Sequence, residues 1–258
     1  MSQSSEVPAK LTQSDKRILA CVGLSAVVIA LYFIPYGWYV LYPFMLVYTF
    51  IHEMGHGIAA LMMGGEFVKF EMWVRGSGMA TFTLPIDASR FAKAFVAFGG
   101  LVAPAIMAAV CMVLARSGKA ARVGLYIFTG ICALSLILVV RNLFGIVFVL
   151  LCGLATFALA KLPKKNTIPQ YSTLFLALTL LTAVFARGDY LFTAVAHTDV
   201  GDAPSDVAQI QDNLFLPYWF WGGLIAIISV AILILGIRAF FRAPAKSESG
   251  TKSKAIQE

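Results

Sequence analysis

Charged residues are scarce in this sequence. Only 13% of its 258 residues are Asp, Glu, Lys or Arg, whereas 60% are hydrophobic and the mean hydropathy is +0.84. Because a soluble domain carries roughly a quarter of charged residues, this composition excludes an ordinary soluble protein and predicts an all-α polytopic membrane protein in contact with the lipid bilayer. The net charge of +7 comes largely from segment ends and tails, so we expect no nucleic-acid partner.

The motifs that cysteine chemistry would need are also missing. The four cysteines each lie inside an apolar run and form no CxxC pair, which argues against a disulfide framework and a thiolate zinc site. We interpret them as small buried hydrophobic residues: Cys21, Cys111, Cys132 and Cys152. No A-x-A-like cleavage site follows the first apolar run at 18–34, so we expect a retained signal anchor and not a cleaved peptide.

Long apolar segments make up most of the chain. Seven of them approach the ~20 residues that a spanning helix needs. They are residues 18–34, 40–63, 92–115, 122–140, 143–160, 171–187 and 214–240. Because only Arg141 and Asn142 separate the fourth from the fifth, these two could form one kinked helix, and we expect about six to seven transmembrane helices. They form a single membrane-embedded domain over 16–242, between polar tails at 1–15 and 243–258 whose composition predicts disorder.

The connection at 64–85 alternates with the period of a β-strand. Phe70 and Met72 share one face with Val68 and Val74, and charged residues occupy the other face. A Gly-Ser-Gly turn then leads into a second alternating run, which predicts a small β-hairpin after the second apolar segment. Because a hairpin edge in lipid would leave backbone groups unsatisfied, the hairpin must lie against protein or line a watery cavity.

Two of the three histidines lie inside the second apolar segment, in the stretch YTFIHEMGHGIAALMMGG (48–65). Four residues on a helix are roughly 400° of rotation and ~6 Å of rise, so His52 and His56 leave the same face one turn apart. Two neutral imidazoles in this geometry can reach one zinc ion, and Glu53 can act as a general base beside it. Ionisable residues in a membrane helix are costly unless paired or functional, which favours a metal site over a structural hydrogen-bonded cluster. We expect the third histidine, His197, to be solvated.

A third zinc ligand is needed, and the polar connection at 187–213 offers carboxylates. Asp206 precedes a helical stretch and is the first choice, with a helix N-cap as its structural alternative. Asp189 directly follows the sixth segment and is the next choice, with an ion pair to Arg187 as its alternative. Asp202 is the third candidate for this ligand.

Segment parity predicts that these groups share one side of the membrane. The second, fourth and sixth segments end on the same face, so the histidines, the Arg141–Asn142 turn and the aspartate-rich connection lie together. With the N-terminus inside, this is the cytoplasmic side. On this side, Asn142 is either a candidate substrate contact or a plain loop residue. Phe70 and Met72 of the hairpin are further candidate substrate contacts.

Four stretches resemble the site-2 protease-like intramembrane zinc metallopeptidases, particularly their short bacterial branch. They are HEMGHGIAALMMGGEFVKFEMWVRGSGMATF, FGGLVAPAIMA, VVRNLFGIVFVLLCG and SDVAQIQDNLFLPYWFW. The resemblance implies Zn²⁺ ligands at His52 and His56, a general base at Glu53, and a β-element that holds a membrane-protein substrate as an added strand. It also implies a multi-pass protein of the bacterial cytoplasmic (inner) membrane. In one departure, the third-ligand motif (Asn-Pro-x-x-Gly or Leu-Asp-Gly) is missing, since RNLFG contains no aspartate.

We therefore expect an intramembrane zinc metalloprotease that hydrolyses peptide bonds of membrane-spanning substrates. The alternative is a catalytically inactive, metallopeptidase-like membrane scaffold or binding protein, which the missing third-ligand motif favours. A small transporter would show internal repeats or broken helices in paired positions, and the sequence contains no such repeat. Nothing in the sequence indicates the oligomeric state.

Overall fold

The computed structural model describes residues 12–186, 188–199 and 201–242. Within these ranges the chain forms eight α-helices, one short 3-10 helix and four strands. Most of the two predicted tails lies outside the described residues. At the N-terminal side the first helix begins at Gln13, earlier than expected, because Thr12 and Asp15 form a capping box around its first turn.

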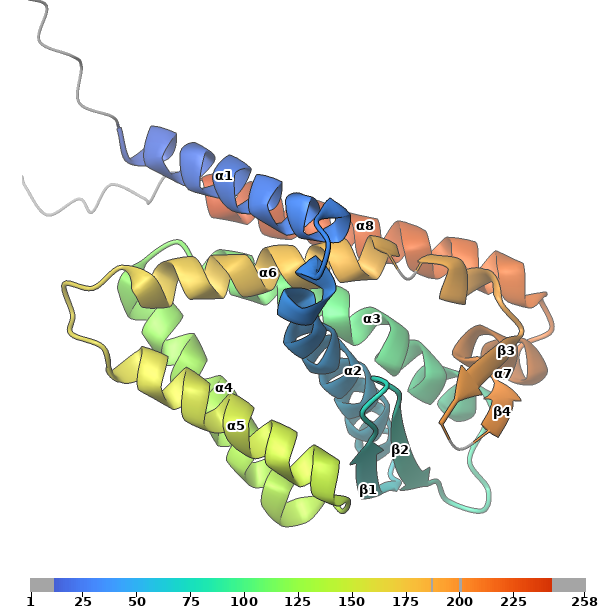
Figure 1. The fold of residues 1–258 in the computed structure, drawn as a ribbon. Coiled ribbons are helices and arrows are strands. Elements are labelled where there is room, and N and C mark those ends of the chain that lie inside the picture. The colour runs from blue at the N-terminus through green and yellow to red at the C-terminus, as the bar shows by residue number, and fades with distance from the viewer. Residues whose placement is uncertain (1–11, 187, 200, 243–258) are drawn as a thin grey trace, which may run out of the picture.

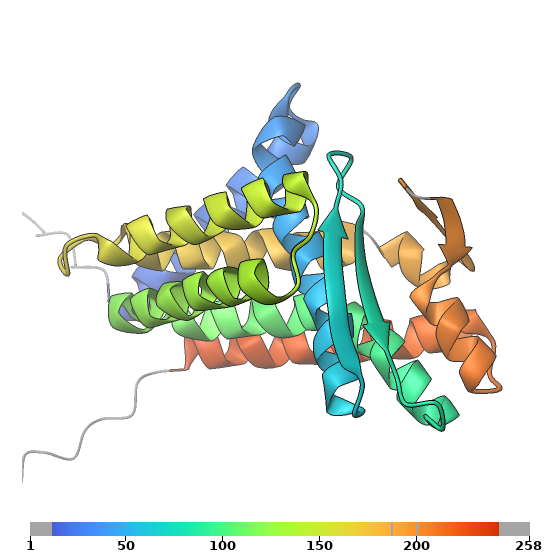
Figure 2. The ribbon, with the colours of Figure 1, turned by 90° about the horizontal axis from the view of Figure 1, so that it is seen from below.

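The expected helical membrane fold is confirmed, with six helices long and apolar enough to cross a membrane among the described residues. They are α1 (Gln13–Phe33), α3 (Arg90–Leu114), α4 (Gly118–Leu138), α5 (Leu143–Lys161), α6 (Ile168–Ala186) and α8 (Tyr218–Phe241). Figures 1 and 2 show that these helices run broadly along one direction. The fourth and fifth apolar segments are separate helices joined by a turn, not one kinked helix.

The helix with the two histidines, α2 (Gly37–Met62), is not one of the six candidate spans. The structure thus gives six of the expected six to seven spans, and a membrane crossing by residues 40–63 stays a prediction. In Figures 1 and 2, α2 crosses the six-helix bundle at a large angle and packs on α3. Unlike the six candidate spans, α2 carries a buried Glu53 and two histidines in its C-terminal half.

One end of the bundle carries all the polar features that the sequence singled out. Helices α1, α4 and α6 end there, α3, α5 and α8 begin there, and α2 lies across it (Figure 1). The prediction that the histidines, the Arg141–Asn142 turn and the aspartate-rich connection share one side is confirmed. However, α1 runs from the far end of the bundle to this end and α2 crosses the bundle, so the histidines lie opposite the start of α1 (Figure 1). The expectation that it shares a side with the N-terminus is wrong.

The predicted hairpin is formed by antiparallel strands β1 (Glu66–Met72) and β2 (Gly78–Thr83). Its register shifts between Phe67 and Lys69, which leaves Val68 exposed and turns Phe67 toward the core. Of the predicted inward face, therefore, only Phe70 and Met72 are buried, because Val74 follows the end of β1 and is exposed. The other edge of β1 is covered, because the Phe70 N–H donates to the Val139 carbonyl at 2.7 Å.

The polar connection after α6 is more ordered than a loop. It contains the 3-10 helix η1 (Gly188–Phe192), the strands β3 (Val195–Thr198) and β4 (Gly201–Pro204), and helix α7 (Asp206–Asn213). The β3–β4 hairpin approaches the tip of the β1–β2 hairpin (Figure 2). There the Ser77 hydroxyl donates to the Asp199 carboxylate at 2.6 Å. Together the two hairpins border the region in which the histidines lie.

Candidate metal centre

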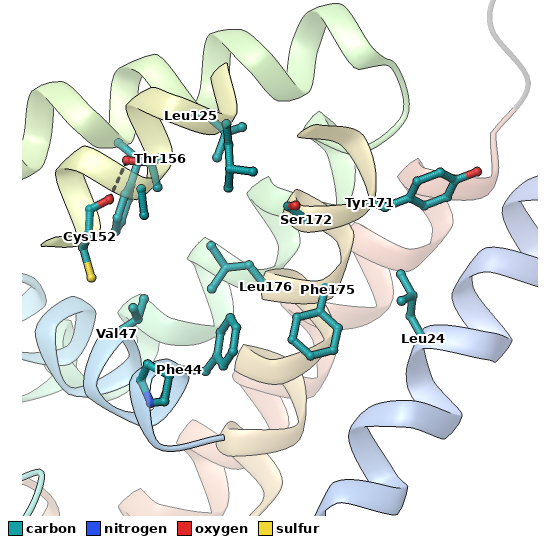
Figure 3. Close-up of a pocket in the computed structure, with 14 residues that line it drawn as sticks. Leu24, Phe44, Val47, Leu125, Cys152, Thr156, Tyr171, Ser172, Phe175 and Leu176 are labelled. Carbon is teal, nitrogen blue, oxygen red and sulfur yellow. Dashed lines mark hydrogen bonds between the residues drawn. The ribbon is translucent and has the colours of Figure 1, made fainter. Parts of the chain in front are cut away.

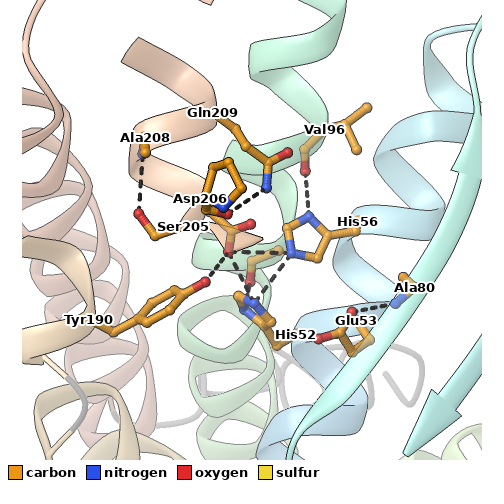
Figure 4. Close-up of polar contacts among 12 residues, drawn as sticks. His52, Glu53, His56, Ala80, Val96, Tyr190, Ser205, Asp206, Ala208 and Gln209 are labelled. Atoms are coloured by element: carbon orange, nitrogen blue, oxygen red, sulfur yellow. Dashed lines mark hydrogen bonds and ion pairs between the residues drawn. The ribbon is translucent and has the colours of Figure 1, made fainter. Parts of the chain in front are cut away.

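Three buried or nearly buried side chains converge from two helices. His52 and His56 project from one face of α2, as their spacing predicted, and Asp206 is the first residue of α7 (Figure 4). The Oδ2 atom of Asp206 lies 3.1 Å from Nε2 of His52 and 3.4 Å from Nε2 of His56. The two Nε2 atoms are 3.3 Å apart. The three ligand atoms thus form a nearly equilateral triangle.

The size of this triangle fits a tetrahedral zinc ion. Zn–N and Zn–O bonds of about 2.0–2.2 Å require ligand atoms roughly 3.3–3.6 Å apart, close to the separations found between His52, His56 and Asp206. Two imidazoles and one carboxylate are also a donor set of catalytic zinc sites, which leave a fourth position for water or substrate. These residues could therefore hold a divalent cation.

Backbone carbonyls of α3 fix the orientation of both imidazoles. Nδ1 of His52 lies 2.9 Å from the Gly100 oxygen, and Nδ1 of His56 lies 2.9 Å from the Val96 oxygen. A carbonyl only accepts, so each Nδ1 carries a proton and each Nε2 faces Asp206. Such contacts fix the tautomer and the ring orientation of metal-binding histidines. The accepting residues Val96 and Gly100 are four residues apart, as are His52 and His56. One turn of α3 therefore provides both carbonyls for one turn of α2.

The Gly100 carbonyl is available to His52 for a specific reason. In a regular helix it would accept the N–H of the residue four positions later. That residue is Pro104, which has no N–H. Gly100 also needs to be glycine, because a Cβ there would lie 2.1 Å from Nε2 of His56. Sequence reasoning did not identify Gly100, Val96 or Pro104 as site residues.

Charge coupling within the cluster is strong in the absence of a cation. Burial alone would raise the pKa of Asp206, but the imidazoles of His56 and His52 hold this pKa well below its ordinary value. Burial would likewise lower the pKa of His56, and the carboxylate of Asp206 outweighs burial and raises it to about 9. A proton shared with Asp206 therefore competes with a cation for the same nitrogen.

Glu53 lies beside the triangle and outside it. Its Oε2 atom accepts the backbone N–H of Ala80 in β2 at 2.7 Å, so the hairpin holds the carboxylate in place (Figure 4). Gly78 allows this approach, because a Cβ at that position would lie 2.9 Å from Cγ of Glu53. The carboxylate is buried, and its second oxygen is left for chemistry.

The outer edge of β2 runs past this carboxylate. Ala80 pairs with Phe70, whose N–H and C=O both bond to residues 139–141 on the far side of β1. In an antiparallel pair, the backbone N–H and C=O groups of two opposed residues point either toward each other or away from each other. Since those of Phe70 point away from β2, those of Ala80 point away from β1. The alternation of a strand gives Gly78 and Phe82 the same outward direction.

The other predicted ligands lie apart from the triangle. Asp189 is exposed, and its carboxylate accepts the N–H of Tyr190. Asp202 forms an exposed ion pair with His197 at 2.7 Å, which agrees with the expected exposure of this histidine. The N-cap alternative for Asp206 is wrong, because Ser205 caps α7 through the Ala208 N–H.

The predicted substrate contacts have structural partners. Asn142 caps α5 through the Gly145 N–H, and its amide bonds both backbone groups of Met72. Its contact with substrate stays a prediction. Phe70 and Met72 are 0% exposed and pack in the core, because β1 turns this face toward α2 and α5. Their contact with substrate also stays a prediction.

Tyr190 is a further residue of the site that the sequence did not indicate. Its hydroxyl donates to Oδ2 of Asp206 at 3.4 Å, and its ring packs edge-on against His52 with centroids 6.3 Å apart. Figure 4 shows it on the side of the triangle away from Glu53. Tyr190 lies sixteen residues before Asp206 and in a different element, so their spacing in the sequence does not predict the contact.

A separate cavity lies away from the metal centre. It measures about 470 Å³ and lies between α1, α2, α4, α5 and α6 (Figure 3). Its walls are apolar except for hydroxyls such as those of Thr156, Ser172 and Tyr171, and no residue of the triangle lines it. None of the residues that line it carries a carboxylate or an imidazole.

Comparison with known proteins bears on the whole arrangement. The model of the Peptidase M50B-like family matches residues 23–236. No curated protein and no solved structure matches the chain. The family match includes both histidines, Glu53, the β1–β2 hairpin and Asp206. The resemblance noted in the sequence is thereby confirmed: this chain belongs to the Peptidase M50B-like family, the family of the site-2 proteases.

Proposed function

We propose that this protein is a zinc metalloendopeptidase that cleaves membrane-protein substrates within the bilayer. His52, His56 and Asp206 would hold the zinc ion, and Glu53 would be the general base. The observation that carries the proposal is the triangle of ligand atoms, with sides of 3.1, 3.3 and 3.4 Å, beside a buried glutamate.

Each residue has a distinct task in this proposal. A zinc ion bound there supplies a Lewis acid that lowers the pKa of water toward ~7 and polarises a scissile carbonyl. The carbonyls of Val96 and Gly100 keep both imidazoles in the ligating orientation. The Ala80 N–H fixes Oε2 of Glu53, so Oε1 takes the proton of the attacking water and then delivers it to the leaving amine.

The outer edge of β2 would position the substrate. A membrane helix hides its carbonyls in internal hydrogen bonds, so it must unwind before hydrolysis. Once extended, it can pair as an added strand with the outward backbone groups of Gly78 and Phe82 and with the Ala80 carbonyl, while the Ala80 N–H stays on Glu53. This pairing would place a peptide bond next to the carboxylate that Ala80 already contacts.

The test is a Glu53→Gln variant, with Glu71→Gln as the matched control. Glu71 lies on β1 and pairs with Lys69 at 2.7 Å, away from the triangle. We expect Glu53→Gln to retain bound zinc and to lose cleavage of co-expressed, tagged single-span membrane proteins, whereas Glu71→Gln retains both. Zinc is measured in purified protein and cleavage by immunoblot. Normal proteolysis by Glu53→Gln would refute the mechanism, and protein that binds no zinc would favour the scaffold alternative.

A further inference from the structure

Charged residues are segregated between the two ends of the helix bundle. Of the fifteen Lys and Arg residues that the structure describes, ten lie at the end where α1 begins and α8 ends. Of the ten described Asp and Glu residues, only Asp15 lies there. We call this the basic end. The other end, which carries the metal centre, has five basic and nine acidic residues.

Hydrogen bonds assemble the basic end from four distant parts of the chain. The guanidinium of Arg17 in α1 donates to the carbonyls of Phe240 and Arg116, at 3.4 and 3.2 Å. The guanidinium of Arg122 donates to carbonyls of the α5–α6 connection at 2.7 and 2.9 Å. The start of α1, the α3–α4 turn, the α5–α6 connection and the end of α8 therefore face one compartment (Figure 1).

Two of the five described basic residues at the metal end have acidic partners. Lys69 pairs with Glu71 at 2.7 Å, and Arg75 lies 3.9 Å from Asp199. Exposed aromatic residues also gather at this end, with Trp38 and Tyr39 at the start of α2 and Trp219 at the start of α8. Trp and Tyr are enriched at membrane–water interfaces. The metal centre thus lies close to the interface at the acidic end.

The basic end has short connections near helix ends, which is where Lys and Arg determine membrane orientation. From this distribution we infer that the basic end faces the cytoplasm and that the metal centre opens on the opposite face of the membrane. The inference rests on the proposed function in what it says of the substrate. That substrate is a membrane protein whose extended, cleavable segment is reached from the non-cytoplasmic side.

Labelling of one introduced cysteine at a time, in the full chain in membranes, tests this orientation. Val74→Cys follows β1 at the metal end, and Lys164→Cys lies in the α5–α6 connection; both positions are exposed. The probe is a membrane-impermeant maleimide, applied to right-side-out and inside-out vesicles. The unsubstituted chain, whose four cysteines lie within spanning helices, gives the background. Ile86→Cys, fully exposed before α3, provides a second reporter of the metal end.

We expect Val74→Cys and Ile86→Cys to be labelled in right-side-out vesicles and protected in inside-out vesicles. Lys164→Cys should show the reverse. The opposite pattern, or labelling of both ends from one side, would overturn the inference. Labelling requires no cleavage, so the same experiment in Glu53→Gln protein separates a wrong orientation from a wrong proposed function.

Discussion

The Tyr190 hydroxyl donates to Oδ2 of Asp206 at 3.4 Å, and this is the same oxygen that faces both imidazoles. A donor on a ligating carboxylate orients the ligand and limits its rotation, and loss of such a partner costs about 10- to 100-fold in metal affinity or activity. We therefore expect Tyr190 to act on the candidate metal centre through Asp206.

We expect Tyr190→Phe to weaken zinc binding by about 10- to 100-fold without unfolding the protein. Competition with a chromophoric chelator measures the affinity. Tyr171→Phe is the matched control, because Tyr171 lines the apolar cavity and not the metal centre. Equal zinc affinity in Tyr190→Phe and Tyr171→Phe would exclude this role for the hydroxyl.

Gly100 should tolerate no side chain. A Cβ there would lie 2.1 Å from Nε2 of His56, so Gly100→Ala must displace the imidazole or separate α3 from α2. We expect loss of bound zinc and of cleavage. Gly223→Ala is the matched control, since a Cβ at this position in α8 meets nothing within 4 Å. Zinc content and thermal unfolding of both variants check the prediction, which a zinc-loaded Gly100→Ala protein would contradict.

The identity of the third ligand can be tested by two aspartate variants. Asp206→Asn should lose zinc, because an amide oxygen is a weaker ligand and leaves the imidazoles without their anionic partner. Asp189→Asn should retain zinc, since Asp189 is exposed and its carboxylate accepts a neighbouring backbone N–H. Metal analysis of the purified proteins gives the answer. Retention by Asp206→Asn together with loss by Asp189→Asn would reverse the assignment.

Zinc affinity should depend on pH. Asp206 raises the pKa of His56 to about 9 in the metal-free cluster, so below this pH the imidazole holds a proton that zinc must displace. Affinity should therefore rise as the pH increases toward 9 and fall as the pH decreases. Chelator competition between pH 6 and 9 (approximate limits set by this pKa) measures the slope, and a flat profile would contradict the coupling.

The sequence was sufficient to predict the two histidines of the candidate metal centre and the β1–β2 hairpin. His52 and His56 could be identified because helical periodicity alone places them on one face, and the alternation around Phe70 reports a strand pattern directly. Asp206 could only be ranked above Asp189, because the distance between α2 and α7 depends on how the whole chain packs.

Other features left no local signal. The transverse path of α2 was missed because an apolar run of spanning length predicts a span, whatever angle its neighbours impose. Val96 and Gly100 were missed as site residues because they act through backbone carbonyls, which every residue possesses. The bulge after Phe67 was missed because a single extra residue changes register without changing composition.

Pro104→Ala should separate helix stability from metal binding. The new N–H at position 104 can bond the Gly100 carbonyl, which now accepts from His52. An interior proline costs a helix ~3 kcal/mol, so we expect a higher unfolding temperature together with weaker zinc binding. Pro43→Ala is the matched control, because Pro43 interrupts α2 away from the histidines. If zinc affinity is unchanged in Pro104→Ala, the freed carbonyl has no role.

The missing N–H of Pro104 gives α3 two conflicting demands. An N–H at position 104 would complete the backbone hydrogen bonds of α3 and raise the unfolding temperature. It would also occupy the Gly100 carbonyl, which orients His52. Directed evolution for thermostability alone should therefore favour replacement of Pro104 and yield a sturdier protein with a poorer catalyst. The irregularity in this helix is a functional element, and engineers of this fold should leave it in place.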